Sequence, residues 1–184
     1  MIMFKFTKTA INGVYIIEPQ VFGDNRGYFM ETYSDADFKK NGLNYVFVQA
    51  NQSKSKKGVL RGLHFQIKHP QAKLVRVIKG EVFDVAVDLR KNSSTYGKWV
   101  GALLSESNKK QLLIPRGFAH GFLVISDEAE FVYKCDEFYH PEDEGGIIYN
   151  DSTINIAWPK IDSPILLSEK DKKHPTLYDA KISF

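Results

Sequence analysis

The sequence of 184 residues contains little cysteine, little net charge and no long hydrophobic run. Its single cysteine, Cys135, excludes an internal disulfide and a zinc site built from several cysteines. The 25 basic and 22 acidic residues leave a formal net charge of +3, too small to indicate a nucleic-acid-binding protein. No apolar run reaches the about 18 residues of a membrane-spanning helix, and residues 1–6 lack a signal-peptide pattern. We therefore expect a cytoplasmic protein with no nucleic-acid or membrane partner.

Helix signals are also scarce. Ser34 can cap a short helix that ends at Lys40, before Asn41 and Gly42. A second short helix is expected over residues 169–173, capped by Ser168. The alternative fold is an open antiparallel sheet with helices on one face, and two such helices are too few to cover that face.

Period-two patterns separated by turn residues dominate the rest of the chain and predict many short strands. Strands are expected at residues 14–17, 28–33, 46–50, 59–66, 73–79, 81–89, 99–104, 111–114, 121–125, 130–136 and 147–149. In residues 81–89, one face is apolar and the other has Asp84, Ala86 and Asp88. The high content of Phe (13) and Tyr (9) also favours strands. The fold class predicted for residues 1–184 is one all-β domain, a jelly roll with a few short helices.

Two polar side chains in the strand over residues 59–66 have opposite parity. Arg61 and His64 can face one cavity only if Gly62 forms a bulge or kink that resets the alternation. The other interpretation, that one of them faces the surface, remains equally open at this point.

The segment Pro115-Arg116-Gly117-Phe118-Ala119-His120 resembles the second conserved motif of the cupin superfamily of small β-barrels. Cupins often bind a metal through this histidine and a His-x-His pair in the first motif. The matching stretch here is His64-Phe65-Gln66, with only one histidine, so the metal-ligand set is incomplete. We therefore expect a cupin-type barrel without a metal, although His120 could also be a buried, hydrogen-bonded histidine.

Three further residues could take part in chemistry together with His64. Tyr133 is expected within a strand, Lys73 at the start of a strand and Asp171 in a short helix. Each also has a simpler interpretation: Tyr133 as a packing residue, and Lys73 and Asp171 as solvated surface charges. As a set they suit proton transfer beside a carbonyl, with His as base, Tyr as acid and Lys stabilising an oxyanion. No Ser or Cys nucleophile is indicated.

Three long strings carry a more specific resemblance. They are Arg-Gly-Leu-His-Phe-Gln at 61–66, Gly-Glu-Val-Phe-Asp-Val-Ala-Val-Asp at 80–88, and Ile-Pro-Arg-Gly-Phe-Ala-His-Gly-Phe at 114–122. With them, nearly the whole chain resembles the dTDP-4-dehydrorhamnose 3,5-epimerase family. The resemblance implies a metal-free, cofactor-free cupin jelly roll that forms a homodimer. It also implies inversion of C3 and C5 of a dTDP-linked 4-keto-6-deoxyhexose in dTDP-L-rhamnose synthesis.

The resemblance implies a role for each catalytic residue. His64 would take the proton from the carbon beside the ketone, and Asp171 would orient and charge-balance His64. Tyr133 would return a proton on the opposite face, and Lys73 would stabilise the enolate oxygen.

The resemblance also implies a set of substrate-binding residues, in which Arg and Lys suit a diphosphate and an aromatic ring suits thymine. These residues are Arg26, Glu31, Gln49, Asn51, Arg61, His120, Tyr139, Glu144 and Lys170. Gln49 and Asn51 share strand parity, so both can face one site, and Tyr139 resembles the residue that stacks on thymine. Three alternatives stay open: a 3-epimerase of a dTDP-4-keto-6-deoxyhexose, a non-catalytic sugar-binding cupin, and a metal-dependent cupin.

Overall fold

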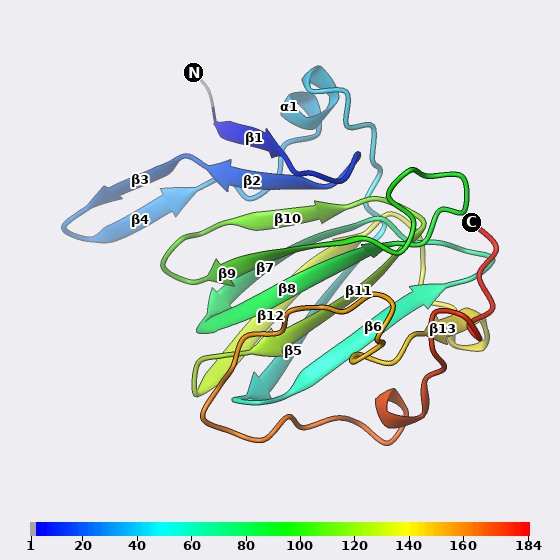
Figure 1. Ribbon diagram of the computed structural model, residues 1–184. Coiled ribbons are helices and arrows are strands. Elements are labelled where there is room, and N and C mark those ends of the chain that lie inside the picture. Colours follow the sequence, from blue (N-terminus) through cyan, green and yellow to red (C-terminus); the bar gives the residue numbers. More distant parts are fainter. Residues whose placement is uncertain (1–2) are drawn as a thin grey trace.

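Two antiparallel β-sheets pack face to face in the computed structural model, which describes residues 3–184 (Figure 1). Residues 1 and 2, part of the segment considered above for a signal peptide, lie outside the described residues. In sheet order, the larger sheet contains β1 (Phe4–Lys8), β2 (Tyr15–Pro19), β10 (Gln111–Ile114), β7 (Lys73–Lys79), β12 (Glu128–Cys135) and β5 (Gln49–Lys56). The smaller sheet contains β13 (Glu144–Gly146), β6 (Leu60–Gln66), β11 (Phe118–Val124), β8 (Glu81–Asp88) and β9 (Trp99–Ser105). This arrangement confirms the predicted all-β jelly roll.

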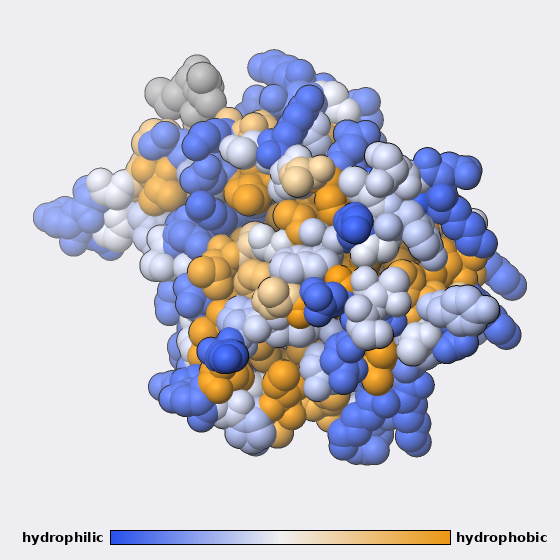
Figure 2. All heavy atoms as spheres, viewed as in Figure 1, coloured by the Kyte–Doolittle hydropathy of each residue, from blue (hydrophilic) through white to orange (hydrophobic). Residues whose placement is uncertain are grey.

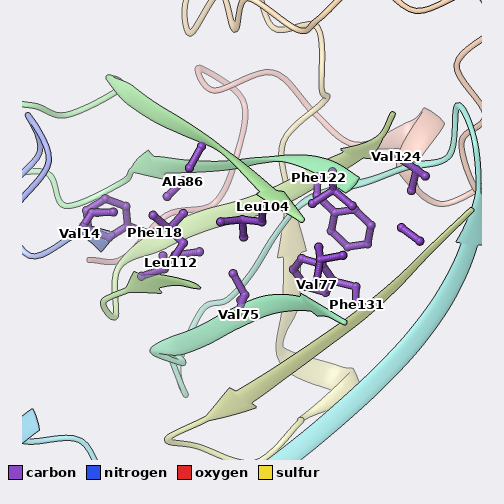
Figure 3. Packing of buried hydrophobic residues seen from close by; sticks show 14 of the residues in the cluster. Val14, Val75, Val77, Ala86, Leu104, Leu112, Phe118, Phe122, Val124 and Phe131 are labelled. Atoms are coloured by element: carbon purple, nitrogen blue, oxygen red, sulfur yellow. The ribbon is translucent and has the colours of Figure 1, made fainter. Parts of the chain in front are cut away.

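The main hydrophobic core lies between the sheets (Figure 3). Phe122 of β11 and Phe131 of β12 stack across it with ring centroids 4.2 Å apart. A second core lies on the outer face of the smaller sheet, where the C-terminal segment, orange to red in Figure 1, runs across the strands. Strand β8 contributes Ala86 to the first core and Val85 and Val87 to the second. The predicted alternation of residues 81–89 is therefore confirmed, and the strand is buried on both faces.

The structure differs from the prediction where strands are polar or lie at an edge. The strand expected at residues 46–50 is misplaced and overlaps the observed strand only at residues 49 and 50, since β5 covers Gln49–Lys56, a polar segment that hydrophobic periodicity does not reveal. Strand β1 and the short β13 were not predicted. The strand expected at residues 147–149 is also wrong, although Ile147 exchanges backbone hydrogen bonds of 2.9 and 3.2 Å with Leu63.

A hairpin of β3 (Val21–Asp24) and β4 (Gly27–Met30) replaces the longer strand expected at residues 28–33. It projects from the two sheets in Figure 1, and in Figure 2 it stands away from the body of the molecule. Three of its aromatic side chains are exposed: Phe22, Tyr28 and Phe29. Aromatic side chains on a projecting hairpin favour burial against a partner.

One of the two expected helices forms. Helix α1 (Asp35–Lys40) begins after Ser34, whose hydroxyl accepts from the backbone N–H of Asp37, and its buried Phe38 packs on the larger sheet. The helix expected over residues 169–173 is wrong. Residues 171–173 form only a single 3₁₀ turn, η2 (Asp171–Lys173), ahead of Pro175. A further 3₁₀ turn, η1 (Pro141–Asp143), precedes β13. Within residues 3–184, no helix has the length and apolar character needed to cross a membrane.

Asp88 at the end of β8 should stabilise the fold in a pH-dependent way. Burial would raise the pKa of Asp88, but hydrogen bonds from Arg90, Ser93 and Thr95 lower that pKa to about 2. The folded pKa lies below the ordinary value of 3.8, so the stabilisation is complete above pH 4 and disappears between about pH 4 and 2. We expect Asp88→Asn to lower the free energy of unfolding by about 2 kcal/mol at pH 7, measured by urea titration.

Asp162→Asn is the matched control, because its carboxylate pairs with Lys57 on the surface. This variant should keep the wild-type urea midpoint. An equal shift of the midpoint in both variants would contradict a special role for Asp88.

Candidate active site

A cavity of about 210 Å³ opens between the two sheets. Its lining residues come from β5, β6, β7, β12, β13 and the loops beside them: Gln49, Asn51, His64, Phe65, Gln66, Gln71, Lys73, Tyr133, Tyr139 and Glu144. Three of the four predicted catalytic residues and four of the predicted substrate-binding residues are among them. The predicted common face of Gln49 and Asn51 is confirmed, since their amides hydrogen-bond to each other at 3.0 Å.

His64 in the cavity wall pairs with the buried Asp171 behind it. Nε2 of His64 lies 2.6 Å from Oδ1 of Asp171, and Asp171 is only 3% exposed. Although burial raises the pKa of Asp171, the hydrogen bond from His64 keeps that pKa below its usual value. Asp171 is therefore a carboxylate at neutral pH and accepts the bond, so Nε2 of His64 holds the proton and Nδ1 has the free lone pair.

The predicted bulge at Gly62 is present and resets the alternation between Arg61 and His64, although Arg61 remains exposed. His64 lies opposite His120, whereas Arg61 lies opposite Phe122, so β6 has one extra residue over this stretch. Gly62 has a φ of +131°, and a Cβ there would collide with the backbone of β11.

The extra residue places Arg61 on the same side of the sheet as the site. Its Nε donates to Oγ of Ser55 at 3.1 Å, and its charge opposes the rise that burial causes in the pKa of Tyr133. Arg61 itself does not line the cavity.

Tyr133 and Lys73 reach the cavity from the larger sheet, opposite His64 on the smaller sheet. They lie on the neighbouring strands β12 and β7, with Nζ of Lys73 5.8 Å from the Tyr133 ring centroid. Burial raises the pKa of Tyr133 and lowers the pKa of Lys73. A phenol hydroxyl and a side-chain amine thus face the imidazole across the cavity.

Polar side chains at the rim hold one another in place. The hydroxyl of Tyr139 donates to Glu144 at 2.8 Å, and Lys170 forms an ion pair with the same carboxylate. The backbone N–H of Tyr139 donates to Gln49 at 2.9 Å. The exposed face of Tyr139 and the ammonium of Lys170 are thereby brought to the same edge of the cavity.

His120 lies deeper than the cavity wall. It is 9% exposed, and its Nε2 lies 2.9 Å from Oδ2 of Asp84. Burial raises the pKa of Asp84, and the neighbouring His120 opposes that rise. His120 is therefore the buried, hydrogen-bonded histidine that the sequence offered as an alternative to a metal ligand. It is also the cross-strand neighbour of His64.

The residues at the cupin metal positions do not fit a metal ion. Gln66 stands in place of the second motif-one histidine, and its Nε2 donates to the carbonyls of His69 and Phe138. Its Oε1 accepts from the backbone N–H of His140. Both N–H groups of the amide are used and its Oε1 is held on the backbone of His140, so Gln66 clamps two loops at the cavity rim and does not replace the missing histidine ligand.

Five of the nine predicted substrate-binding residues are not among the lining residues, and two of these five, Arg26 and Glu31, lie on or beside the projecting hairpin. Arg26 is at the tip of the β3–β4 hairpin, where its guanidinium pairs with Asp24. Glu31 follows β4 directly. Within one chain the structure does not bring these side chains together with His64.

Gln66, Gln71 and His174 are site residues that the sequence reasoning missed. His174 is three residues after Asp171, and its ring lies 5.5 Å from that of His64 in an edge-on arrangement. The spacing of three residues between Asp171 and His174 in a short turn was the feature of the sequence that could have indicated His174.

Comparison with known proteins places this geometry in a family. The family model described as dTDP-4-dehydrorhamnose 3,5-epimerase matches residues 8–179. The chain belongs to this family. A member from Methanothermobacter thermautotrophicus, named dTDP-4-dehydrorhamnose 3,5-epimerase, is 57% identical over 94% of both chains.

Solved structures agree with this assignment. The dTDP-6-deoxy-D-glucose-3,5-epimerase from Legionella pneumophila, solved with dTDP-4-keto-L-rhamnose, is 48% identical, with a TM-score of 0.93 over 96% of this chain and 94% of that one. A 3'-monoepimerase from Streptomyces bikiniensis, solved with dTDP-quinovose, is 31% identical, with a TM-score of 0.87 over 94% and 87% of the two chains. The cupin-like jelly roll predicted for this epimerase family member is confirmed.

Proposed function

We propose that this protein inverts C3 and C5 of dTDP-4-dehydro-6-deoxy-D-glucose and so produces dTDP-4-dehydro-L-rhamnose. The observation that carries the proposal is the placement of His64, oriented by Asp171, across the cavity from Tyr133. The identity of 57% to a 3,5-epimerase supports it further.

The reaction follows from the acidity of hydrogens beside a ketone. The C4 carbonyl acidifies the hydrogens on C3 and C5, and Nδ1 of His64 accepts one of them. The carboxylate of Asp171 stabilises the imidazolium that forms, and the ammonium of Lys73 stabilises the enolate oxygen. Tyr133 then returns a proton from the opposite sheet, which inverts the carbon. These proton-transfer steps need no metal ion and no redox cofactor.

The rim suits a nucleoside diphosphate. Tyr139 is half exposed and offers a ring face to thymine, while Lys170 and Arg61 supply positive charge for the diphosphate. Gln49 and Asn51 offer amides to the sugar. Glu144 holds Tyr139 and Lys170, and His120 supports the wall behind the sugar.

Arg26 and Glu31 contribute to the site in this proposal through a homodimer. Phe22, Tyr28 and Phe29 on the projecting hairpin are exposed apolar surface. A groove of about 380 Å³ on the larger sheet shares Asn51 and Tyr133 with the active-site cavity. A partner's hairpin lying in this groove would bring its own Arg26 and Glu31 beside the cavity.

Light scattering after size exclusion tests the dimer. The wild-type mass should be twice that of one chain, and Phe29→Lys should shift it toward the monomer and lower activity, since Phe29 is 64% exposed on the hairpin. Tyr178→Lys is the control, because Tyr178 is 94% exposed outside the hairpin. A monomeric wild-type enzyme with full activity would exclude this arrangement.

Deuterium exchange tests the reaction itself. The protein is incubated with dTDP-4-dehydro-6-deoxy-D-glucose in deuterated water, and both carbons are followed by NMR. Deuterium at C3 and C5 is the expected result, and full activity after treatment with a chelator is expected as well. No exchange at either carbon would exclude the proposal.

A 3-epimerase is the second candidate, since a 3'-monoepimerase is 31% identical to this chain. Exchange confined to C3 would establish it. The cytoplasmic location and the lack of nucleic-acid and membrane partners stay predictions.

A further inference from the structure

Three side chains of types that can bind a metal ion meet at His64, on the side away from the cavity. His64, Asp171 and His174 each offer one ligand atom, and these atoms lie within 4.8 Å of one another. Oδ1 of Asp171 is 2.6 Å from Nε2 of His64 and 3.4 Å from Nε2 of His174. Neither Asp171 nor His174 lines the substrate cavity.

His174 is held in place with a free nitrogen. Its side chain is only 10% exposed, and its Nε2 has no hydrogen-bond partner among residues 3–184. The ring lies against Gly146, where any Cβ would collide with it, and Gly146 is the strand partner of His64. A buried polar atom without a partner is costly, and a bound cation would satisfy it.

We propose that His64, Asp171 and His174 bind one Zn²⁺ ion and that the bound ion inhibits the epimerase. Two imidazole nitrogens and one carboxylate oxygen are ligands that zinc prefers, and three protein ligands leave one position for water. Tetrahedral zinc with bonds of 2.0–2.1 Å needs ligand atoms about 3.3 Å apart. The present separations bracket this value, so small side-chain shifts suffice.

The inhibition follows from the imidazole of His64 and rests on its proposed role as base. A neutral imidazole has one N–H and one lone pair. Zinc on Nε2 uses the lone pair there, so the proton moves from Nε2 to Nδ1. Nδ1 then cannot accept hydrogen from C3 or C5. Because the ion lies outside the cavity, kcat should fall with little change in the KM for the sugar nucleotide.

Binding is tested apart from activity, by calorimetric titration of the metal-free protein with Zn²⁺ and by the visible spectrum of bound Co²⁺. We expect one ion per chain, and at least about tenfold weaker binding in His174→Ala and His174→Gln. His140→Ala is the matched control, since His140 stacks on His69 away from this cluster, and should bind like the wild type. No stoichiometric binding, or wild-type affinity in both His174 variants, would overturn the site.

Activity is then compared with and without Zn²⁺ for each protein. In the wild type and His140→Ala, kcat should fall at least about tenfold and recover with a chelator, whereas His174→Ala should resist zinc. Stoichiometric binding without effect on kcat would overturn the inhibition. A protein that binds zinc through His174 but never exchanges deuterium would contradict the proposed function while leaving the metal site intact.

Discussion

His64→Ala should abolish deuterium exchange at both C3 and C5 and reduce turnover at least about 10³-fold. One base serves both carbons, because the imidazole of His120 has its Nε2 on Asp84 and the imidazole of His174 does not line the cavity. Loss of a general base costs about 10² to 10⁴ in rate, and here the loss applies to two successive abstractions. NMR in deuterated water measures exchange and product together.

His140→Ala again provides the control, because the side chain of His140 stacks on His69 and does not line the cavity, and its hydrogen bond to Gln66 comes from the backbone N–H, which the substitution keeps. It should exchange both positions at near wild-type rate. Near-normal turnover in His64→Ala would mean that another group is the base. Exchange lost at one carbon alone would mean that each carbon has its own base.

Tyr133→Phe should separate proton removal from proton return. The variant keeps His64 and Asp171, so abstraction continues, but the donor on the opposite sheet is lost. The imidazolium exchanges the abstracted hydrogen with the deuterated water and then returns deuterium to the original face. We expect epimerised product to fall about 10² to 10⁴-fold, while recovered substrate contains deuterium.

Tyr96→Phe, on a loop beside β9, is the matched loss of one phenol hydroxyl elsewhere on the chain. It should behave like the wild type. If Tyr133→Phe lost exchange and product in equal measure, Tyr133 would act in the abstraction step or in binding. Unchanged product formation would show that water or another side chain returns the proton.

Strands with a clear alternation of apolar and polar residues were predicted well, and strands without it were not. Strands β7 and β8 have strong alternation and were predicted within one residue. Strand β5 was misplaced, because its inward side chains are as polar as its outward ones. The helix expected after Ser168 shortened to one turn at Asp171, because the residue before Pro175 disfavours helix.

The amino-acid sequence alone was enough to predict the fold class, the family resemblance and most of the residues that line the cavity. Strand parity is local, and family strings preserve order and spacing, so both can be read without coordinates. The resemblance implied that Asp171 orients His64, but the geometry of that pair, the free nitrogen of His174 and the exposure of the Arg26 hairpin required the tertiary structure. His64 and Asp171 are 107 residues apart in the chain. Only the folding of the C-terminal segment against the smaller sheet brings them into contact, and no local pattern encodes that contact.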